Sequence, residues 1–594
     1  MAVASDTGRM TASPAELGRV ESAGPRGGGG RGRLEPPGHS ERFHFWFGLA
    51  VVLVLAVLPR AWAVWHTEVI QRDGVTFIRY ARLLTTDPAA AVAQFDQHVG
   101  YPWLLKTVHA AVAARLAEPD GVQGWELSGQ LVSLVAGVVA TLGVWAWAGL
   151  AIDWRVAWVG AGMFAVGRKW AMLGADVMSD ATALALWVWA VVGAVWLAKR
   201  QSACGGTGAR MATWRVALLA GGVGVLAGAA YLVRPEGLGA LVVAWAVWTW
   251  GWMRGGAALG VRGLGRWGVM VVASGVAAAA VAGPYMAAIG GLTKKKAVGE
   301  LIPVSLSVPV EPALLAMGGP ARDFATPLAV VAQTVEAIHP VVFGWVGVWV
   351  VLLAVHVSIP RSWRLAFLRW PRGPGGVAVW TTVVLYAVVA ARLHLTAGYL
   401  DWRHCMALAF ALVPLAGAGL LAVVDFFAVL ASPLRLKSLT VPQFVAWQWA
   451  WVFPLVLVAT GWQSFRPLHA HNSYVMAAAE RLQSELPGRE DGFIVTNLPW
   501  VLHYAQRPGK VLDTWRLSND DAMAALEAMG AKVTHVVVSE RWLGEDASPL
   551  TQRLTPPTYE LLEVIPQRQG QDRLRLYRVR HPGAWRDVGG GCAR

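Results

Sequence analysis

A few ionised side chains lie directly beside long apolar stretches of this sequence. Asp73 stands in QRDGVTFIRYARLL, just after the first such stretch, and Asp176 and Asp180 share the stretch ADVMSD. Because a carboxylate is costly to keep near a membrane and can take a proton from a hydroxyl group, these acids are candidates for acid–base chemistry. The spacing of Asp176 and Asp180 would place both on one helix face, where they could orient a substrate or, with Asp73, hold a metal ion.

Structural roles are the alternative for each acid. Asp is a favoured residue at helix N-termini, so Asp73 could cap a helix that begins at Gly74. Asp176 or Ser179 could likewise cap the helix that follows them. The sequence leaves both interpretations open, and capping and catalysis are compatible.

Cationic side chains mark the ends of other apolar stretches. Arg234 and Glu236 lie in RPEGL, and Arg403 and His404 lie in DWRH. A guanidinium offers paired donors to phosphate oxygens, so Arg234 is a candidate phosphate ligand, with an ion pair to Glu236 as the alternative. Lys294 opens a basic run that could close over a phosphate or could simply be solvated.

Composition defines the class of protein. Hydrophobic residues make up 55% of the 594 residues and charged residues only 15%, and the mean hydropathy is +0.45. So much apolar surface requires a lipid solvent, which predicts a polytopic membrane protein. The net charge of +14 comes from Lys and Arg placed between apolar stretches, so we exclude nucleic acid as a partner. The three cysteines lie far apart and indicate neither disulfides nor a zinc site.

The apolar stretches predict an α-helical membrane domain over residues 45–462, preceded by a disordered cytoplasmic tail over 1–44. Eleven stretches are long enough to span a bilayer. They are 45–65, 128–151, 155–173, 178–198, 215–233, 238–253, 267–289, 326–356, 376–393, 403–424 and 443–462.

Charge asymmetry predicts the orientation. Lys and Arg are more numerous in the loops on the same side as the N-terminus, which predicts that the N-terminus is cytoplasmic. We expect the protein in the inner membrane of the cell. The cations that oppose this bias predict an anion-binding surface on the outer face, with contacts to lipid headgroups as the alternative. They are Arg168, Lys169, Arg234, Lys294, Lys295, Lys296, Arg322, Arg392 and Arg403.

Two regions lie outside the membrane on the outer face. Residues 66–127 have the amphipathic pattern of two or three helices on the membrane surface. Residues 463–582 have a soluble composition, with strands expected at 493–497, 533–540 and 573–580 and a helix at 520–529. We therefore expect a small extracytoplasmic α/β domain of accessory role, followed by a flexible tail over 583–594.

Several motifs, in this order, resemble the GT-C glycosyltransferases of the dolichyl-phosphate-mannose protein mannosyltransferase type and their bacterial relatives that use polyprenyl-phosphate sugars. The resemblance covers the membrane domain. The motifs are RDGVTFIRYARLL, QHVGYPWLL, ADVMSDATALAL, AYLVRPEGL and YLDWRHCMALAFALVPL.

The resemblance implies an inverting glycosyltransferase that moves a sugar from a polyprenyl-phosphate donor to a protein, glycolipid or polysaccharide. It makes Asp73 the catalytic base and Arg403 a ligand of the carrier phosphate. His98 and Tyr101 would bind substrate, and His98 and His404 could shuttle protons or make structural hydrogen bonds.

No cofactor is expected, because a sugar on a lipid phosphate already carries a good leaving group; a divalent metal is possible but no spacing demands it. Membrane lipids are expected partners. A secondary transporter is the alternative class, but it usually contains inverted repeats, and this sequence has no such symmetry. A receptor or assembly scaffold would leave the polar residues at one face unexplained.

Overall fold

The computed structural model describes most of the membrane part and most of the C-terminal region. The described residues are 39–115, 121–203, 211–294, 373–397, 402–431, 458, 461–486, 488, 492–512, 519–540, 547–567 and 572–580. Predictions for most of the N-terminal tail, for residues 295–356, for most of 443–462 and for the C-terminal tail lie outside these residues.

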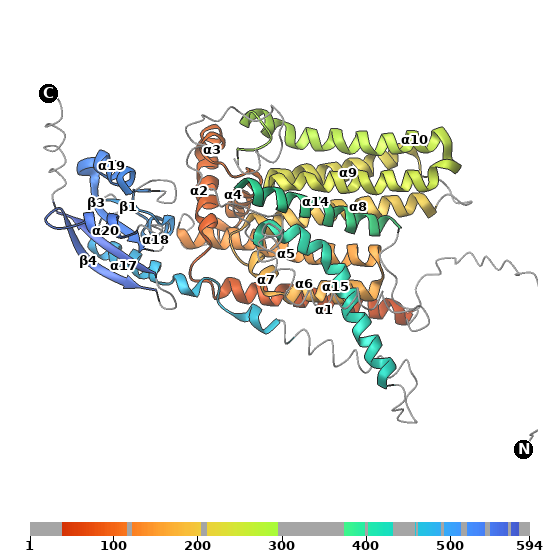
Figure 1. Cartoon of the computed structure of the whole chain (residues 1–594), viewed down its shortest axis with the longest axis horizontal. Helices are drawn as coiled ribbons and strands as arrows, with labels where there is room; N and C mark the ends of the chain where they lie inside the picture. Colours follow the sequence, from red (N-terminus) through yellow and green to blue (C-terminus); the bar gives the residue numbers. More distant parts are fainter. Residues whose placement is uncertain are drawn as a thin grey trace, which may run out of the picture. The chain divides into compact units, whose positions relative to one another are not determined.

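Long apolar helices dominate the first part of the chain (Figure 1). Within the described residues, six helices are long and apolar enough to cross a membrane. They are α1 (His39–Trp65), α5 (Val122–Ala151), α8 (Ser179–Ala203), α9 (Thr213–Val233), the second half of α10 (Gly239–Ile289) and α14 (Gly373–Ala397). Two shorter apolar helices are α6 (Trp154–Val166) and α15 (Met406–Ala431), of which the apolar part is Met406–Leu421.

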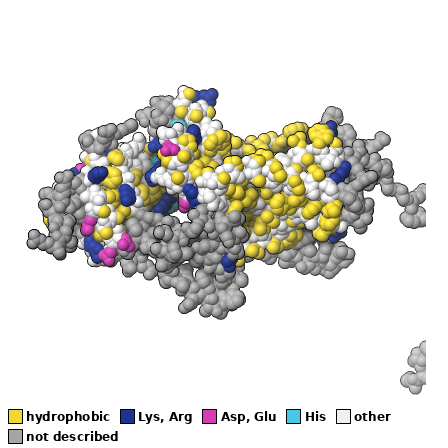
Figure 2. All heavy atoms as spheres, turned by 90° about the horizontal axis from the view of Figure 1, so that it is seen from above, with side chains coloured by type: hydrophobic (Ala, Val, Ile, Leu, Met, Phe, Trp, Pro, Cys, Tyr) yellow, Lys and Arg dark blue, Asp and Glu magenta, His cyan; other side chains and the backbone are white. Residues whose placement is uncertain are grey.

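The outer surface of these helices suits lipid. Figure 2 shows hydrophobic side chains over a broad surface of the helical part. Leu218 of α9 and Val272 and Val276 of α10 are among the exposed large hydrophobic residues. A surface of this kind is stable only in an apolar solvent, so the chain is a multi-pass membrane protein. The prediction of eleven spans stays a prediction, because the span at 326–356 and most of the span at 443–462 lie outside the described residues.

Helix α10 turns back on itself. Trp245 Nε1 donates to Ser274 Oγ at 3.0 Å, and Trp267 Nε1 donates to Thr249 Oγ1 at 3.1 Å. Residues 29 positions apart would be separated by roughly 44 Å in a straight helix, at 1.5 Å per residue. The chain therefore reverses between Thr249 and Trp267, where the sequence predicts a loop between two spans.

Helix α8 is the centre of the bundle. It packs against α5, α9 and α10, which run beside it (Figure 1). Small and β-branched side chains such as Val188, Ala190 and Ala194 are fully buried and allow close helix contact. Because α8 is held from several sides, its first turn is a rigid place for a functional side chain.

Arg60 of α1 is a fully buried cation within the membrane domain. Its Nη1 donates to the carbonyl oxygens of Ala56 at 2.8 Å and Ala165 at 3.0 Å, and its Nη2 donates to that of Trp170 at 3.4 Å. The last two carbonyls lie at the end of α6 and in α7 (Arg168–Leu173). Arg60 thus satisfies carbonyl groups at the break between these helices and holds α7 in place.

The described part of the segment between α1 and α5 contains three helices. They are α2 (Arg72–Thr86), α3 (Pro88–Gln94) and α4 (Gly100–Ala113), and α2 lies across the ends of the long helices (Figure 1). Val75, Ile78 and Ala81 form the buried face of α2, which packs against α4. The apolar face thus covers protein, and the loop roofs one end of the bundle.

The C-terminal region forms a five-stranded sheet with strand order β2-β1-β3-β5-β4. The predicted strands are β1 (Phe493–Thr496), β3 (Val533–Ser539) and β5 (Arg573–Val579), and the sequence analysis missed β2 (Gly509–Val511) and β4 (Tyr559–Pro566). Strands β2, β1 and β3 are parallel, whereas β3, β5 and β4 are antiparallel.

The helices of this region are α17 (Tyr474–Glu485), α18 (Pro499–Ala505), α19 (Asn519–Met529, as predicted) and α20 (Ala547–Arg553). The small α/β unit is confirmed, while its domain boundaries stay a prediction.

Candidate functional site

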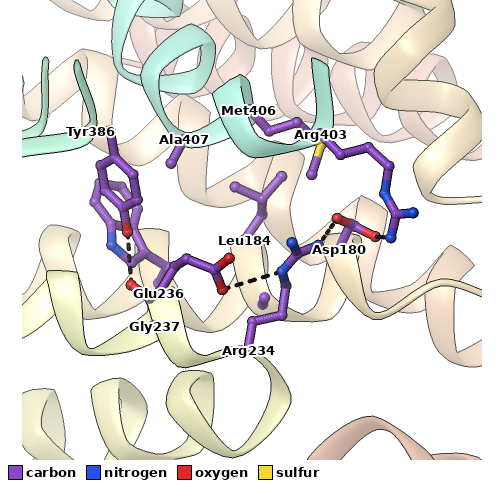
Figure 3. A pocket seen from close by; sticks show the side chains of 11 residues that line it. Asp180, Leu184, Arg234, Glu236, Gly237, Tyr386, Arg403, Met406 and Ala407 are labelled. Carbon is purple, nitrogen blue, oxygen red and sulfur yellow. Dashed lines mark hydrogen bonds and ion pairs between the residues drawn. The ribbon is translucent and has the colours of Figure 1, made fainter. Parts of the chain in front are cut away.

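Asp180 is the buried centre of a charged cluster in the first turn of α8. Its side chain is fully buried and binds two guanidinium groups. Arg234 Nη1 donates to Oδ1, and Arg403 Nη2 donates to Oδ2 at 3.0 Å (Figure 3). A buried carboxylate is stable only when it is paired in this way.

Arg403 connects this cluster to the first turn of α2. Its Nη1 donates to Asp73 Oδ2 at 2.7 Å, so one guanidinium bridges two carboxylates. Burial would lower the pKa of Arg403, but the charges of Asp180 and Asp73 outweigh burial and raise it. The Nε of Arg403 is buried and has no hydrogen-bond partner among the described residues. A buried donor of this kind is a place where an oxygen of a ligand can bind.

Arg234 lies between two acids at the end of α9. Besides Asp180 it contacts Glu236 Oε2 at 3.5 Å, the pair that the sequence analysis gave as the alternative to phosphate binding. Glu236 lies in the 3₁₀ helix η1 (Pro235–Leu238), and Asp180 lies in the first turn of α8. Burial lowers the pKa of Arg234, but Asp180 and then Glu236 raise it above its ordinary value.

A small cavity of about 50 Å³ lies against this cluster. Figure 3 shows Asp180, Arg234 and Arg403 on one side of it and Glu236 and Tyr386 on another. The hydroxyl of Tyr386 donates to the backbone carbonyl of Glu236 at 2.8 Å. The remaining lining side chains are apolar: Ala183, Leu184, Trp187, Met406 and Ala407.

Asp176 lies outside this cluster. Helix α8 begins at Ser179, and Asp176 belongs to the turn before it, so the expectation that Asp176 and Asp180 share one helix face is wrong. Its Oδ1 accepts from the backbone nitrogens of Gln71 at 3.0 Å and Val177 at 2.7 Å. Its Oδ2 contacts Nε2 of His469 at 2.7 Å.

A second, larger cavity lies beside Asp176 and has a volume of about 640 Å³. Asp176 and Arg403 both line it, so Arg403 borders the small and the large cavity. The other polar lining residues are Gln71, Arg168, Lys169, Arg466, His469 and His471. The large cavity thus brings three of the predicted outer cations, Arg168, Lys169 and Arg403, together with a segment from the start of the C-terminal region.

Other predicted site residues make hydrogen bonds to other parts of the chain and line neither cavity. His98 is buried; its Nδ1 contacts the carbonyl of Tyr231 at 2.8 Å and its Nε2 contacts Thr293 Oγ1 at 3.2 Å. The hydroxyl of Tyr101 donates to the carbonyl of Gly129 at 3.0 Å.

Lys294 also binds within the protein. Its Nζ donates to the carbonyl oxygens of Val92 at 2.5 Å and Ala93 at 2.9 Å in the last turn of α3, where a cation is favourable. His404 lies in the 3₁₀ helix η5 (Trp402–Cys405), and its side chain is outside the described part of the structure. Substrate binding by these four residues stays a prediction.

The first turn of α2 approaches the turn around Asp176 closely. A Cβ atom at Gly74 would lie 2.9 Å from Val177 Cβ, so only glycine fits there without a shift. Helix α2 begins at Arg72, one residue before Asp73, so Asp73 is not the N-cap residue considered in the sequence analysis. Its side chain, 43% exposed, instead reaches Arg403.

Helix α18 of the C-terminal region holds the chain just before Asp73. Tyr504 Oη accepts from the backbone nitrogen of Ile70 at 3.0 Å, and Trp500 Nε1 donates to the backbone carbonyl of Ile70 at 2.8 Å. His503 Nε2 contacts Glu126 Oε1 of α5 at 3.0 Å. Both backbone groups of Ile70 are thereby fixed three residues before Asp73.

Three lining residues were not predicted from the sequence: Arg466, His469 and Tyr386. Arg466 and His469 lie in RPLHAHN, a polar segment directly after the last predicted span and on the same predicted side as Asp73. That position was the available signal. Tyr386 lies within an apolar helix, α14, and the sequence offers no signal for it.

As to metals, the described residues contain no group of three His, Cys, Asp or Glu side chains that could hold an ion.

Comparison with solved structures identifies the architecture. ArnT from Cupriavidus metallidurans in the apo state is 12% identical with a TM-score of 0.54, over 92% of this chain and 99% of that chain. The same protein bound to undecaprenyl phosphate gives 13% identity and a TM-score of 0.53, over 91% and 99%. The chain has the GT-C fold.

A third GT-C structure agrees. The Archaeoglobus fulgidus oligosaccharyltransferase in the apo form is 12% identical with a TM-score of 0.52, over 85% of this chain and 70% of that chain. No family model matches the sequence, and no curated protein matches it either. The GT-C fold predicted from the sequence motifs is therefore established by the structure alone.

Proposed function

We propose that this protein is a glycosyltransferase that moves a sugar from a polyprenyl-phosphate donor to a hydroxyl group of an acceptor outside the cytoplasm. The observation that carries the proposal is the position of Arg403, which joins Asp73 of the outer loop to Asp180 of the bundle. A base and two phosphate-binding cations are thereby within one cluster. The GT-C fold, found in an ArnT structure bound to undecaprenyl phosphate, supports the same donor class.

Arg234 and Arg403 are the proposed ligands of the carrier phosphate. Asp180 binds both guanidinium groups and so orients them, and the Nε of Arg403 is available for a phosphate oxygen. Donors that are held in place stabilise the charge that develops on the leaving phosphate. The apolar walls of the small cavity suit the start of a polyprenyl chain.

Asp73 is the proposed base. Arg403 occupies its Oδ2, and its side chain is the most exposed of this cluster, so an acceptor can reach it. Asp73 takes the proton of the acceptor hydroxyl, whose oxygen bonds to the anomeric carbon while the bond from that carbon to the phosphate oxygen breaks. The carrier leaves as polyprenyl phosphate. Attack opposite the leaving phosphate inverts the anomeric configuration.

The test compares two Asp→Asn variants of the full chain in lipid nanodiscs. Undecaprenyl-phosphate sugars are incubated with candidate protein, glycolipid and polysaccharide acceptors, and released undecaprenyl phosphate is measured by mass spectrometry. Asp73→Asn should lower the rate by about 100-fold or more, the usual contribution of a general base. Asp87→Asn, at the cap of α3, should keep the rate because Asn is an equally good N-cap residue.

Two results would count against the proposal. A folded Asp73→Asn variant with the wild-type rate would remove Asp73 as the base. Wild-type protein that releases no carrier from any sugar donor with any acceptor class would remove the transferase itself.

A further inference from the structure

The large cavity carries an excess of positive charge. Apart from Arg403, whose charge is matched by Asp73 and Asp180, its lining includes the cations Arg168, Lys169 and Arg466 and one carboxylate, Asp176. Concave sites lined by one sign of charge raise the local concentration of ions of the opposite sign. The cavity is therefore electrostatically suited to an anion.

Asp176 serves to build the cavity wall. Its two oxygens accept hydrogen bonds from the backbones of Gln71 and Val177 and contact His469. His469 has a backbone φ of 51°, a conformation that is unfavourable for residues other than glycine. The Asp176 contact holds this strained segment over the cavity, so the wall is a specific structure that joins three separate parts of the chain.

The two cavities differ in size and chemistry. The small one, of about 50 Å³, has mostly apolar walls, whereas the large one, of about 640 Å³, has the many polar groups named above. Sites for small molecules have volumes of roughly 300–1,000 Å³. The large cavity can thus hold a polar group the size of a sugar, which the small cavity cannot.

Arg403 lines both cavities and binds Asp73. Ligands in the two cavities would therefore approach each other at Arg403, the residue that binds the proposed base, as the donor and acceptor of a group transfer must. Since the carrier phosphate is assigned to the small cavity, the large cavity is the space left beside Arg403 for the transferred sugar and for the polar group of the second substrate.

We propose that the large cavity is the acceptor site and that the acceptor carries a phosphate or carboxylate group, which Arg168, Lys169 and Arg466 bind. The term acceptor rests on the proposed transferase function. The proposal adds that the acceptor is an anionic molecule, bound through charges that are separate from those of the carrier phosphate.

The test measures anion binding without turnover. The full chain in nanodiscs is loaded with undecaprenyl phosphate, so that the carrier site is filled, and is titrated calorimetrically with glucose 6-phosphate, glucuronate and glucose. Wild type should bind at least one of the two anionic sugars at least tenfold more tightly than glucose. The comparison of glucose 6-phosphate with glucuronate separates a phosphate from a carboxylate acceptor.

Paired variants assign the binding to the cavity. The double variant Arg168→Gln/Arg466→Gln should lose at least tenfold in affinity for the preferred anionic sugar and keep undecaprenyl phosphate in native mass spectra. Arg168→Lys/Arg466→Lys, which keeps both charges but loses the paired guanidinium donors, should bind the anionic sugar more tightly than the double Gln variant and more weakly than wild type. Arg234→Gln should show the opposite pattern, with loss of the carrier and retention of the anionic sugar.

Three results would overturn the proposal: equal binding of glucose and both anionic sugars by wild type, unchanged binding by the double Gln variant, or loss of undecaprenyl phosphate from that variant. The last would make the large cavity the carrier site. Selective binding of an anionic sugar by a protein that fails the turnover assay would leave an anion site and remove its role as an acceptor site. Failure of this proposal is thus separate from failure of the transferase.

Discussion

Arg403 Nη1 lies 2.7 Å from Asp73 Oδ2, although 330 positions separate the two residues in the sequence. The contact joins the first turn of α2 to η5, the short helix that precedes α15. Through its Nη2 the same guanidinium reaches Asp180, so the proposed base and the proposed phosphate ligands depend on one side chain.

Loss of Arg403 should impair both stability and turnover. Arg403→Gln removes one of the guanidinium partners of the fully buried Asp180, and removal of one partner of a buried ion pair costs roughly 3 kcal/mol or more in free energy of unfolding. We expect a lower thermal midpoint and a large fall in carrier release. Arg580→Gln, which breaks an exposed pair with Glu560, is the control and should leave both almost unchanged. Equal effects of the two variants would contradict the bridging role.

Helix α18 should control turnover by holding the chain before Asp73. Tyr504→Phe leaves the buried backbone N–H of Ile70 without its acceptor, at a cost of about 1–3 kcal/mol. We expect a several-fold lower rate of carrier release with unchanged binding of undecaprenyl phosphate in native mass spectra. Tyr80→Phe is the matched control, since the Tyr80 hydroxyl has no hydrogen-bond partner among the described residues. A wild-type rate in a folded Tyr504→Phe protein would show that the contact is only structural.

Gly74 should tolerate no larger side chain. A Cβ atom there would meet Val177 Cβ at 2.9 Å and its carbonyl oxygen at 3.0 Å, so Gly74→Val must displace α2 and with it Asp73. We expect a lower thermal midpoint and a lower rate. Gly221→Ala in α9 is the control: nothing lies within 4 Å of its Cβ, and Ala stabilises a helix interior by roughly 0.5–1 kcal/mol relative to Gly. A Gly74→Val protein as stable as wild type would disprove the close approach.

Stability should fall in acid because of His535 in β3. Burial, and then the charge of Arg578, lower the pKa of His535 below its ordinary value of about 6.5. The unfolded chain therefore binds a proton more readily than the folded one, so stability is complete above pH 6.5 and declines as the pH falls from there toward the folded pKa. Differential scanning fluorimetry of the full chain between about pH 5 and 7.5 should show a smaller decline for His535→Gln. An equal decline in both proteins would assign the acid sensitivity to other groups.

The sequence alone was enough to predict the membrane domain, the helices between its first two spans and the GT-C fold, because long apolar stretches, amphipathic periods and local motifs are recorded in consecutive residues. Three strands and α19 were predicted for the same reason. β2 has only three residues, and β4 exposes Leu561 and Val564, so neither has the period of a buried strand.

Only the tertiary structure decided which charged residues act together. Asp73, Asp180, Arg234 and Arg403 meet because separate helices carry them to one end of the bundle, a relation that no local pattern contains. Asp176 was predicted beside Asp180, but the chain turns between the two and directs Asp176 to His469 instead. Residue types and local periods thus predicted the fold and the candidate chemistry, whereas ion pairs between distant residues, which buried charges require, determined the site.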